Sequence, residues 1–146
     1  MIPLIVLVVA FAGFWLAGLG VAWFADWQHA LRAALGAMFL LTASAHWGKR
    51  RPDLVRMVPR GFGNAGLWVT LTGIAELVIA AGLQVPATAR AVALLAAAML
   101  VAIFPANAKA AREGLTIGGR PVPRLGVRIA IQVVFLAALA AAAWRR

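Results

Sequence analysis

Residues 65–84 read AGLWVTLTGIAELVIAAGLQ, twenty residues in which Glu76 is the only charged side chain. A transmembrane helix needs about 20 mostly apolar residues, because each residue rises about 1.5 Å and the hydrocarbon core of a bilayer is about 30 Å thick. The stretch therefore predicts a helix that crosses a membrane and carries one carboxyl group near the middle of the bilayer.

Four other stretches have the same apolar character. We predict five transmembrane helices, over residues 2–24, 29–47, 65–84, 89–108 and 125–144. Two of the four connections between them have only four residues, and such short connections join antiparallel helices. The expected fold is therefore all-α, a polytopic membrane protein whose last four helices form an antiparallel four-helix bundle. Residues 1–146 would form one integral membrane domain, with an additional N-terminal transmembrane helix in 1–27 and a four-helix unit in 28–146.

The composition supports a membrane protein, since 64% of the residues are hydrophobic and only 12% are charged. Cysteine is absent, which excludes disulfide scaffolds, thiolate nucleophiles and cysteine-ligated metal centres within this chain. Lys and Arg number 14 against four acids, a net charge of +10 that in a soluble protein would suggest nucleic acid. Here the charges lie between apolar runs, so we expect the lipid bilayer and its anionic headgroups as the partner, and no nucleic acid.

The basic residues also predict an orientation. Ten of them lie in the two long connections or next to them: Lys49, Arg50, Arg51, Arg56, Arg60, Lys109, Arg112, Arg120, Arg124 and Arg128. The opposite side holds Arg32, Arg90, Arg145 and Arg146. Because cytoplasmic loops carry the excess of Lys and Arg, we predict that the N-terminus and both long connections are cytoplasmic and that the C-terminus is outside.

The first apolar stretch has two interpretations, a cleaved signal peptide or a retained helix. It lacks a basic N-terminal region and is long for a signal peptide, and Trp23 and Trp27 do not suit a cleavage site. We therefore expect the helix to be retained.

Glu76 has two interpretations as well. It is a neutral carboxyl group that hydrogen-bonds a neighbouring helix as packing, or it handles a proton or orients a ligand, which is the default hypothesis for an intramembrane acid. Polar groups on the other helices fall in the same half of the membrane and predict one ligand-binding cluster. Its expected members are His46, Thr72, Glu76, Asn107, Arg128 and Gln132.

The separate members of this cluster also have simpler explanations. His46 alone could rest at headgroup level, and Asn107 alone could cap a helix. Pro105 lacks an N–H and predicts a bend in the last turns of the fourth span, beside Asn107. We expect Glu76 to face the bundle interior and contact the fifth span through Arg128 or Gln132. Glu76→Leu should then destabilise the protein more than Glu76→Gln.

Other chemistries are not supported by the residues. His29 and His46 lie at opposite ends of one predicted helix, about 25 Å apart, so they cannot ligate one metal or haem together. Gly-rich phosphate loops and nucleophile elbows are absent, and residues 114–123 are expected to form a turn-rich loop. We predict no metal, no haem and no iron–sulfur cluster.

Several short motifs occur in an order that resembles the DoxX-like family of small bacterial membrane proteins. They are residues 32–46, PDLVRMVP at 52–59, TGIAEL at 72–77, AGL at 81–83, FPAN at 104–107, and Pro121-x-Pro123 followed by Arg128-x-x-x-Gln132. The resemblance spans residues 32–132, most of the chain. Family members typically have four helices, so the first span would be an addition, and their spacing between the histidine and the proline is usually shorter than that from His46 to Pro52.

The resemblance implies a place in the bacterial inner membrane and a link to membrane-bound, quinone-dependent redox systems. The leading hypothesis is therefore a non-catalytic accessory subunit that binds a quinone-like lipophilic ligand and serves a membrane or peripheral oxidoreductase. An intramembrane isomerase or oxidoreductase with Glu76 as general acid/base is the alternative. A purely structural helix-packing protein is a third, and the sequence leaves open whether the chain is an enzyme.

Overall fold

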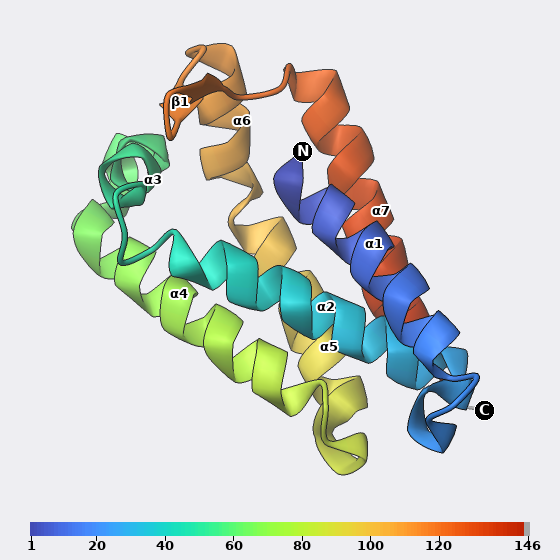
Figure 1. Ribbon diagram of the computed structural model, residues 1–146. Helices are drawn as coiled ribbons and strands as arrows, with labels where there is room; N and C mark the ends of the chain where they lie inside the picture. Colours follow the sequence, from blue (N-terminus) through green and yellow to red (C-terminus); the bar gives the residue numbers. More distant parts are fainter. Residues whose placement is uncertain (145–146) are drawn as a thin grey trace.

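The structure is a computed structural model that describes residues 1–144, and most of this part of the chain is helical (Figure 1). The long helices are α1 (Ile2–Ala17), α2 (Trp27–Ser44), α4 (Ala65–Gly82), α5 (Pro86–Ala102) and α7 (Leu125–Ala143). The shorter ones are η1 (Ala22–Ala25), α3 (Arg51–Met57), η2 (Arg60–Phe62) and α6 (Phe104–Arg112). Helices α2 and α4 each begin at a side-chain cap. Asp26 accepts a hydrogen bond from the Gln28 amide, and Asn64 accepts one from the Leu67 amide.

The mostly helical fold agrees with the all-α prediction, and one small strand pair was not predicted. Strands β1 (Thr116–Ile117) and β2 (Arg120–Pro121) pair antiparallel, with Thr116 opposite Pro121. The turn between them is Gly118–Gly119, and both glycines have positive φ, 59° and 75°. Two consecutive left-handed residues match the twist of a two-residue hairpin, so this glycine pair closes a hairpin within the loop predicted at 114–123.

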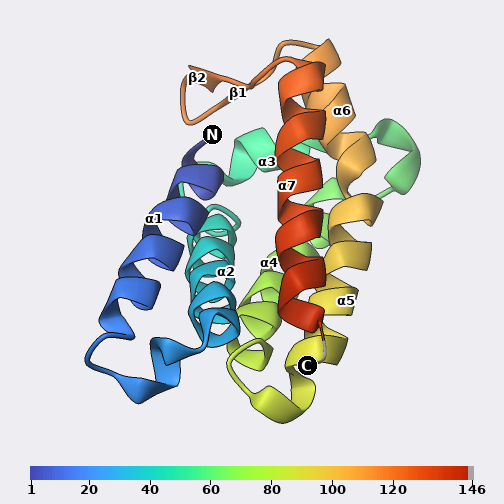
Figure 2. The same ribbon diagram turned by 90° about the vertical axis from the view of Figure 1, so that its right-hand side faces the viewer.

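Four of the long helices form a closed ring. Helix α2 contacts α4 and α7, and α5 contacts the same two helices from the other side. Helix α1 lies outside the ring and packs along α2 (Figure 2). The largest fully buried side chains come from α2, the end of α4 and α7: Leu35, Met38, Phe39, Leu83 and Leu139.

The two ends of the molecule differ in content. Figure 2 shows α3, the hairpin, the outer end of α6 and the N-terminus at one end, and the C-terminal end of α7 with the two short connections at the other. Both long connections thus lie at the same end as the N-terminus, as the charge pattern predicts. Arg145 and Arg146 lie outside the described residues.

By length and composition, three helical stretches are able to cross a membrane: Ala65–Gly82, Pro86–Arg112 and Leu125–Ala143. The predicted first span over residues 2–24 is wrong at its end, because α1 has 16 residues and stops at Ala17. A Cβ on Gly18 would lie 2.5 Å from the Phe24 carbonyl oxygen, so this glycine lets the chain fold back onto η1. A helix of that length rises only about 24 Å.

The predicted bend in the fourth span is confirmed. Helix α5 ends at Ala102 and α6 begins at Phe104, with Pro105 in the first turn of α6. Proline has no N–H and its ring displaces the preceding turn, so the helical hydrogen bonds are interrupted here. The break leaves backbone carbonyl groups available to side chains from α7.

Candidate functional site

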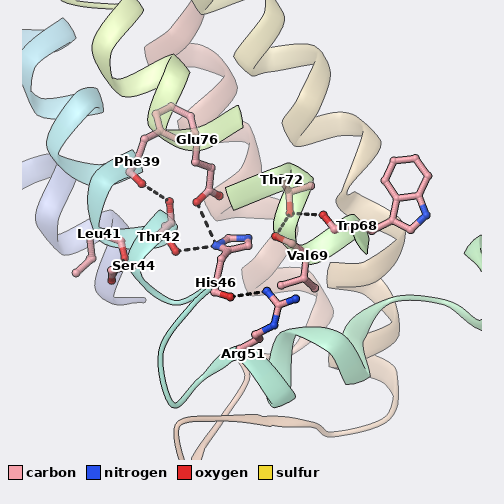
Figure 3. A network of polar contacts seen from close by, with 10 residues as sticks. All are labelled: Phe39, Leu41, Thr42, Ser44, His46, Arg51, Trp68, Val69, Thr72 and Glu76. Atoms are coloured by element: carbon pink, nitrogen blue, oxygen red, sulfur yellow. Dashed lines mark hydrogen bonds and ion pairs between the residues drawn. The ribbon is translucent and has the colours of Figure 1, made fainter. Parts of the chain in front are cut away.

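Glu76 lies midway along α4 and is buried, with 6% of its surface exposed. Its carboxyl group points to the end of α2, where Oε2 lies 3.6 Å from Nδ1 of His46 (Figure 3). His46 is also buried, so the two ionisable side chains face each other inside the protein. We call them the His46–Glu76 pair.

The imidazole of His46 is held in place from its own helix. His46 follows α2 by two residues, and its Nδ1 lies 3.1 Å from the backbone oxygen of Thr42. A carbonyl oxygen only accepts hydrogen bonds, so Nδ1 carries the hydrogen and Nε2 of the neutral ring is an acceptor. The Nδ1–H group therefore donates to the Thr42 carbonyl, and Oε2 of Glu76 lies 3.6 Å from the same nitrogen, too far for a hydrogen bond.

Arg51 fixes the turn that carries His46. Its guanidinium donates to the His46 carbonyl oxygen at 2.8 Å, to the Gly66 carbonyl oxygen at 3.0 Å and to the hydroxyl of Thr70 at 2.9 Å. Two of these acceptors belong to α4, so one arginine ties the end of α2 to the start of α4. From the sequence, Arg51 was predicted only as a cytoplasmic cation, and this role was not predicted.

Gly73 gives His46 the space it occupies. A Cβ at this position would lie 2.7 Å from Cβ of His46 and 2.8 Å from the Trp47 ring, closer than real Cβ atoms come to such neighbours. Gly73 is one helical turn before Glu76, so the close approach of α2 to α4 occurs beside the carboxyl group. The sequence contains a sign of this contact, because the motif TGIAE places Gly73 three residues before Glu76.

Thr42 is a further neighbour of the pair, and it was not predicted from the sequence. Its side chain lies beside the Glu76 carboxyl group, and its hydroxyl donates to the Phe39 carbonyl oxygen at 3.0 Å. Thr42 precedes His46 by four residues, a spacing that places both on one helical face and was available as a signal.

The carboxyl group of Glu76 keeps one unused hydrogen-bonding position. Within residues 1–144, the buried side-chain polar atoms without a hydrogen-bond partner are Oε2 of Glu76 and Nε of Arg128. A buried polar atom without a partner costs free energy, and native structures tolerate few of them. Oε2 is therefore available to a proton shared with His46 or to a hydrogen bond with a bound molecule.

The other predicted site residues form a second cluster around the helix break. Nη1 of Arg128 donates to Oδ1 of Asn107 at 2.7 Å and to its backbone oxygen at 3.3 Å. Nε2 of Gln132 donates to the Leu100 carbonyl oxygen at 2.8 Å. These bonds join α7 to both sides of the break between α5 and α6.

The predicted contact of Glu76 with the fifth span is wrong. No hydrogen bond or ion pair within residues 1–144 joins Glu76 to Arg128 or Gln132, because α4 packs against α2 while α7 packs against α2, α5 and α6. Thr72 does not join the pair either, since its hydroxyl donates to the backbone of Trp68 and Val69 in its own helix. The six predicted residues thus separate into the pair, the second cluster and Thr72.

His29 and His46 lie at opposite ends of α2, as predicted. His29 stacks on Trp23 with ring centroids 4.1 Å apart, far from Glu76 along the helix. No group of three or more His, Asp or Glu side chains that could hold a metal ion occurs within residues 1–144.

Two cavities lie away from the pair in the described part of the chain. The larger, about 480 Å³, lies between α3, η2 and α6, and the smaller, about 370 Å³, is lined by residues of α5 and α7. Neither includes Glu76 or His46 among its lining residues.

The comparisons with known proteins bear on family membership alone. No curated protein and no solved structure matched the chain. A family described as a domain of unknown function, DUF8561, matches residues 35–145, a stretch that begins within α2 and leaves α1 outside. The chain therefore belongs to the DUF8561 family.

Proposed function

We propose that the protein is a five-span protein of the bacterial inner membrane, with α2, α4, α5–α6 and α7 as a four-helix bundle and α1 as an added span. The closed ring of these helices and the three long apolar stretches support this proposal. The gathering of the basic connections at one end supports a cytoplasmic location for that end. The motif resemblance to DoxX-like proteins supports the bacterial membrane.

The proposed function is that of an accessory subunit of a redox system that binds a quinone-like lipophilic ligand at the His46–Glu76 pair. The observation that carries this function is the buried Oε2 of Glu76, which has no hydrogen-bond partner. A protonated carboxyl group donates to a quinone carbonyl, and Nε2 of the neutral His46 ring accepts from a quinol hydroxyl. The pair thus offers both hydrogen-bonding roles that a quinone and its reduced form need.

Access to the pair runs through the seam between α2 and α4. Exposed apolar side chains of α4, such as Ile74 and Val78, face away from the core and suit contact with lipid tails. Because both side chains of the pair are buried, binding requires the turn that carries His46 to move from α4. Ligand binding should therefore weaken the contacts of Arg51 with the His46 carbonyl.

Histidine resonances offer a direct test, because the chain has only two histidines. The protein labelled with ¹⁵N-histidine would be placed in lipid nanodiscs and titrated with decylubiquinone. The proposal predicts that the ring signals of His46 shift while those of His29, at the other end of α2, stay constant. Glu76→Gln should weaken the response, and Glu113→Gln is the matched control at an exposed glutamate.

Equal shifts of both histidines, or none, would contradict a quinone site at the pair. The role as an accessory subunit is tested separately by gentle solubilisation from the native membrane. A redox enzyme that co-purifies with the wild-type protein supports the role. If the protein elutes alone and without a lipophilic ligand, the accessory role is contradicted.

A second candidate function is an intramembrane enzyme that moves a proton on a lipid-soluble substrate. The proximity of His46 favours it, because an imidazole beside a carboxyl group is a common acid/base arrangement. Total membrane lipids incubated in D₂O with the wild-type protein should then gain deuterium at a carbon position. Glu76→Gln should abolish this gain. If neither quinone binding nor exchange is found, the remaining candidate is a helix-packing protein.

A further inference from the structure

The larger cavity lies at the basic end of the molecule and is separate from the His46–Glu76 pair. Its volume is about 480 Å³, and it is bordered by α3, η2, the start of α4 and the end of α6. Three cations and one acid line it, together with apolar side chains, and the residues that matter here are Arg56, Val58, Arg60, Lys109, Glu113 and Leu115. We call it the basic-end cavity.

Two of the three cations have no acidic partner. Arg56 forms an ion pair with Asp53, which satisfies its charge. No carboxylate within residues 1–144 lies in ion-pair distance of Arg60 or Lys109. The cavity therefore contains uncompensated positive charge, only partly offset by the presence of Glu113 in its wall.

Lys109 is held in position by the backbone rather than by an anion. Its ammonium group donates to the carbonyl oxygens of Arg56 at 2.7 Å and Val58 at 3.0 Å. An ammonium group has three hydrogens, so one N–H remains for a ligand. The two backbone bonds fix the charge where α3 ends, which reduces the entropy lost when an anion binds.

Aromatic side chains indicate where this cavity lies relative to the membrane surface. Trp68 donates its indole N–H to the Phe62 carbonyl oxygen at 2.7 Å, and both rings are about half exposed. Exposed Trp at the end of a transmembrane helix marks the headgroup region of a bilayer. Phe62 belongs to η2, which also carries Arg60, so in the membrane orientation proposed above the cavity lies at the level of lipid phosphates.

We propose that the basic-end cavity binds the phosphate group of an anionic membrane phospholipid. The Arg60 guanidinium and the free N–H of Lys109 would bind the phosphate oxygens. Val58 and Leu115 offer apolar contact to the glycerol and the upper acyl chain. A soluble phosphate has no such apolar part, so the mixed wall favours the lipid.

The test measures lipid retention by native mass spectrometry, with the full chain in nanodiscs of equal parts phosphatidylglycerol and phosphatidylcholine. The wild-type protein should retain phosphatidylglycerol preferentially. Arg60→Gln should lower that preference about fivefold, as expected for one cation near the surface. The double variant Arg60→Gln/Lys109→Gln should lower it further, and Arg60→Gln alone suffices if the double variant does not fold.

The matched control is Lys49→Gln/Arg120→Gln, which removes one lysine and one arginine that are exposed and outside the cavity wall. Its retention of phosphatidylglycerol should equal that of the wild type. An equal loss in the control would show general attraction to the basic end and would overturn the proposal. Competition by millimolar inorganic phosphate that removes the lipid would identify a soluble phosphate site and would overturn it as well.

Discussion

The second cluster on α7 and the His46–Glu76 pair both place polar groups in an apolar helical interior. They differ in whether the polar side chains find hydrogen-bond partners. Gln132 donates to a backbone oxygen beside the break at Pro105, and Nη1 of Arg128 donates to Asn107. Oε2 of Glu76 has no hydrogen-bond partner and faces an ionisable ring at 3.6 Å.

This difference distinguishes polar side chains that the fold requires from a carboxyl group that it does not require. A broken helix leaves carbonyl groups that must find donors, and α7 supplies them, so the fold explains these donors, although Nε of Arg128 itself has no hydrogen-bond partner. The position of Glu76 is not explained in this way, since no broken helix requires a carboxyl group there. The pair is therefore the part of the interior whose chemistry goes beyond packing.

The largest expected effect is that of Gly73→Ala. The added Cβ would collide with His46 and Trp47, and such overpacking costs about 1–3 kcal/mol. Thermal unfolding in detergent should show a clear loss of stability, together with loss of the ¹⁵N shift of His46 on quinone addition. The control is Gly126→Ala on α7, where a Cβ meets no atom within 4 Å. Equal melting of Gly73→Ala and the wild type would show that α2 does not approach α4 as described.

Glu76→Leu should leave stability unchanged or raise it, by about 1 kcal/mol, because it removes a buried oxygen without a partner. This reverses the expectation from sequence, which assumed that Arg128 or Gln132 would be stranded. Chemical denaturation of the variant in detergent measures the change. A loss above about 1 kcal/mol would mean that the carboxyl group stabilises the fold and that the contrast with α7 fails.

Gln132→Leu should have the opposite outcome. The Leu100 carbonyl oxygen would lose its donor beside the helix break, at a cost of about 0.6–2 kcal/mol. Quinone binding should be unaffected, since Gln132 does not contact the pair. The denaturation and quinone-binding assays therefore distinguish the two clusters. Gln132→Leu should change stability alone, and Glu76→Leu should change quinone binding alone. If Gln132→Leu abolished quinone binding, the two clusters would have to be treated as one site.

The smallest effect concerns Asp53 at the basic end. A hydrogen bond from the Gly118 amide and one from Arg56 lower the pKa of Asp53 below its ordinary value. Its contribution to stability is therefore present above the unfolded pKa of about 3.9 and is lost as pH falls through the lower folded pKa. Asp53→Asn should lower the melting temperature slightly at pH 7, and the difference from the wild type should shrink as pH falls toward 2. A difference that persists at pH 2 would rule out the carboxylate as its source.

Hydropathy and charge were sufficient to locate α4, α5 and α7, the break near Pro105 and the shared end of the long connections. These features depend on the composition of a segment, which is visible in the sequence alone. The end of α1 was misplaced because Gly18 matters through its contact with Phe24, a tertiary feature. The hairpin was missed because a run of turn residues does not reveal which pair of glycines closes it.

The burial of Glu76 could be predicted from its place in an apolar run, but its partner could not. Helical spacing shows which residues share a face, and it does not show which neighbouring helix that face meets. The decisive contact joins α2 to α4 through Gly73 and Arg51, and neither residue stands out in the sequence. Grouping polar residues by depth alone therefore merged two clusters into one.

The most direct test of the central claim is a solid-state NMR distance measurement between glutamate side-chain carbons and histidine ring nitrogens in liposomes. The chain contains two glutamates, Glu76 and Glu113, and two histidines, His29 and His46, so labelling both residue types leaves few pairs to distinguish. The account predicts one coupling, between ¹³Cδ of Glu76 and ¹⁵Nδ1 of His46, consistent with the 3.6 Å contact of Oε2 with Nδ1. Glu76→Gln should remove that glutamate signal, and Glu113→Gln should leave it. The absence of any glutamate–histidine coupling in the wild-type protein would contradict the pair and the function built on it.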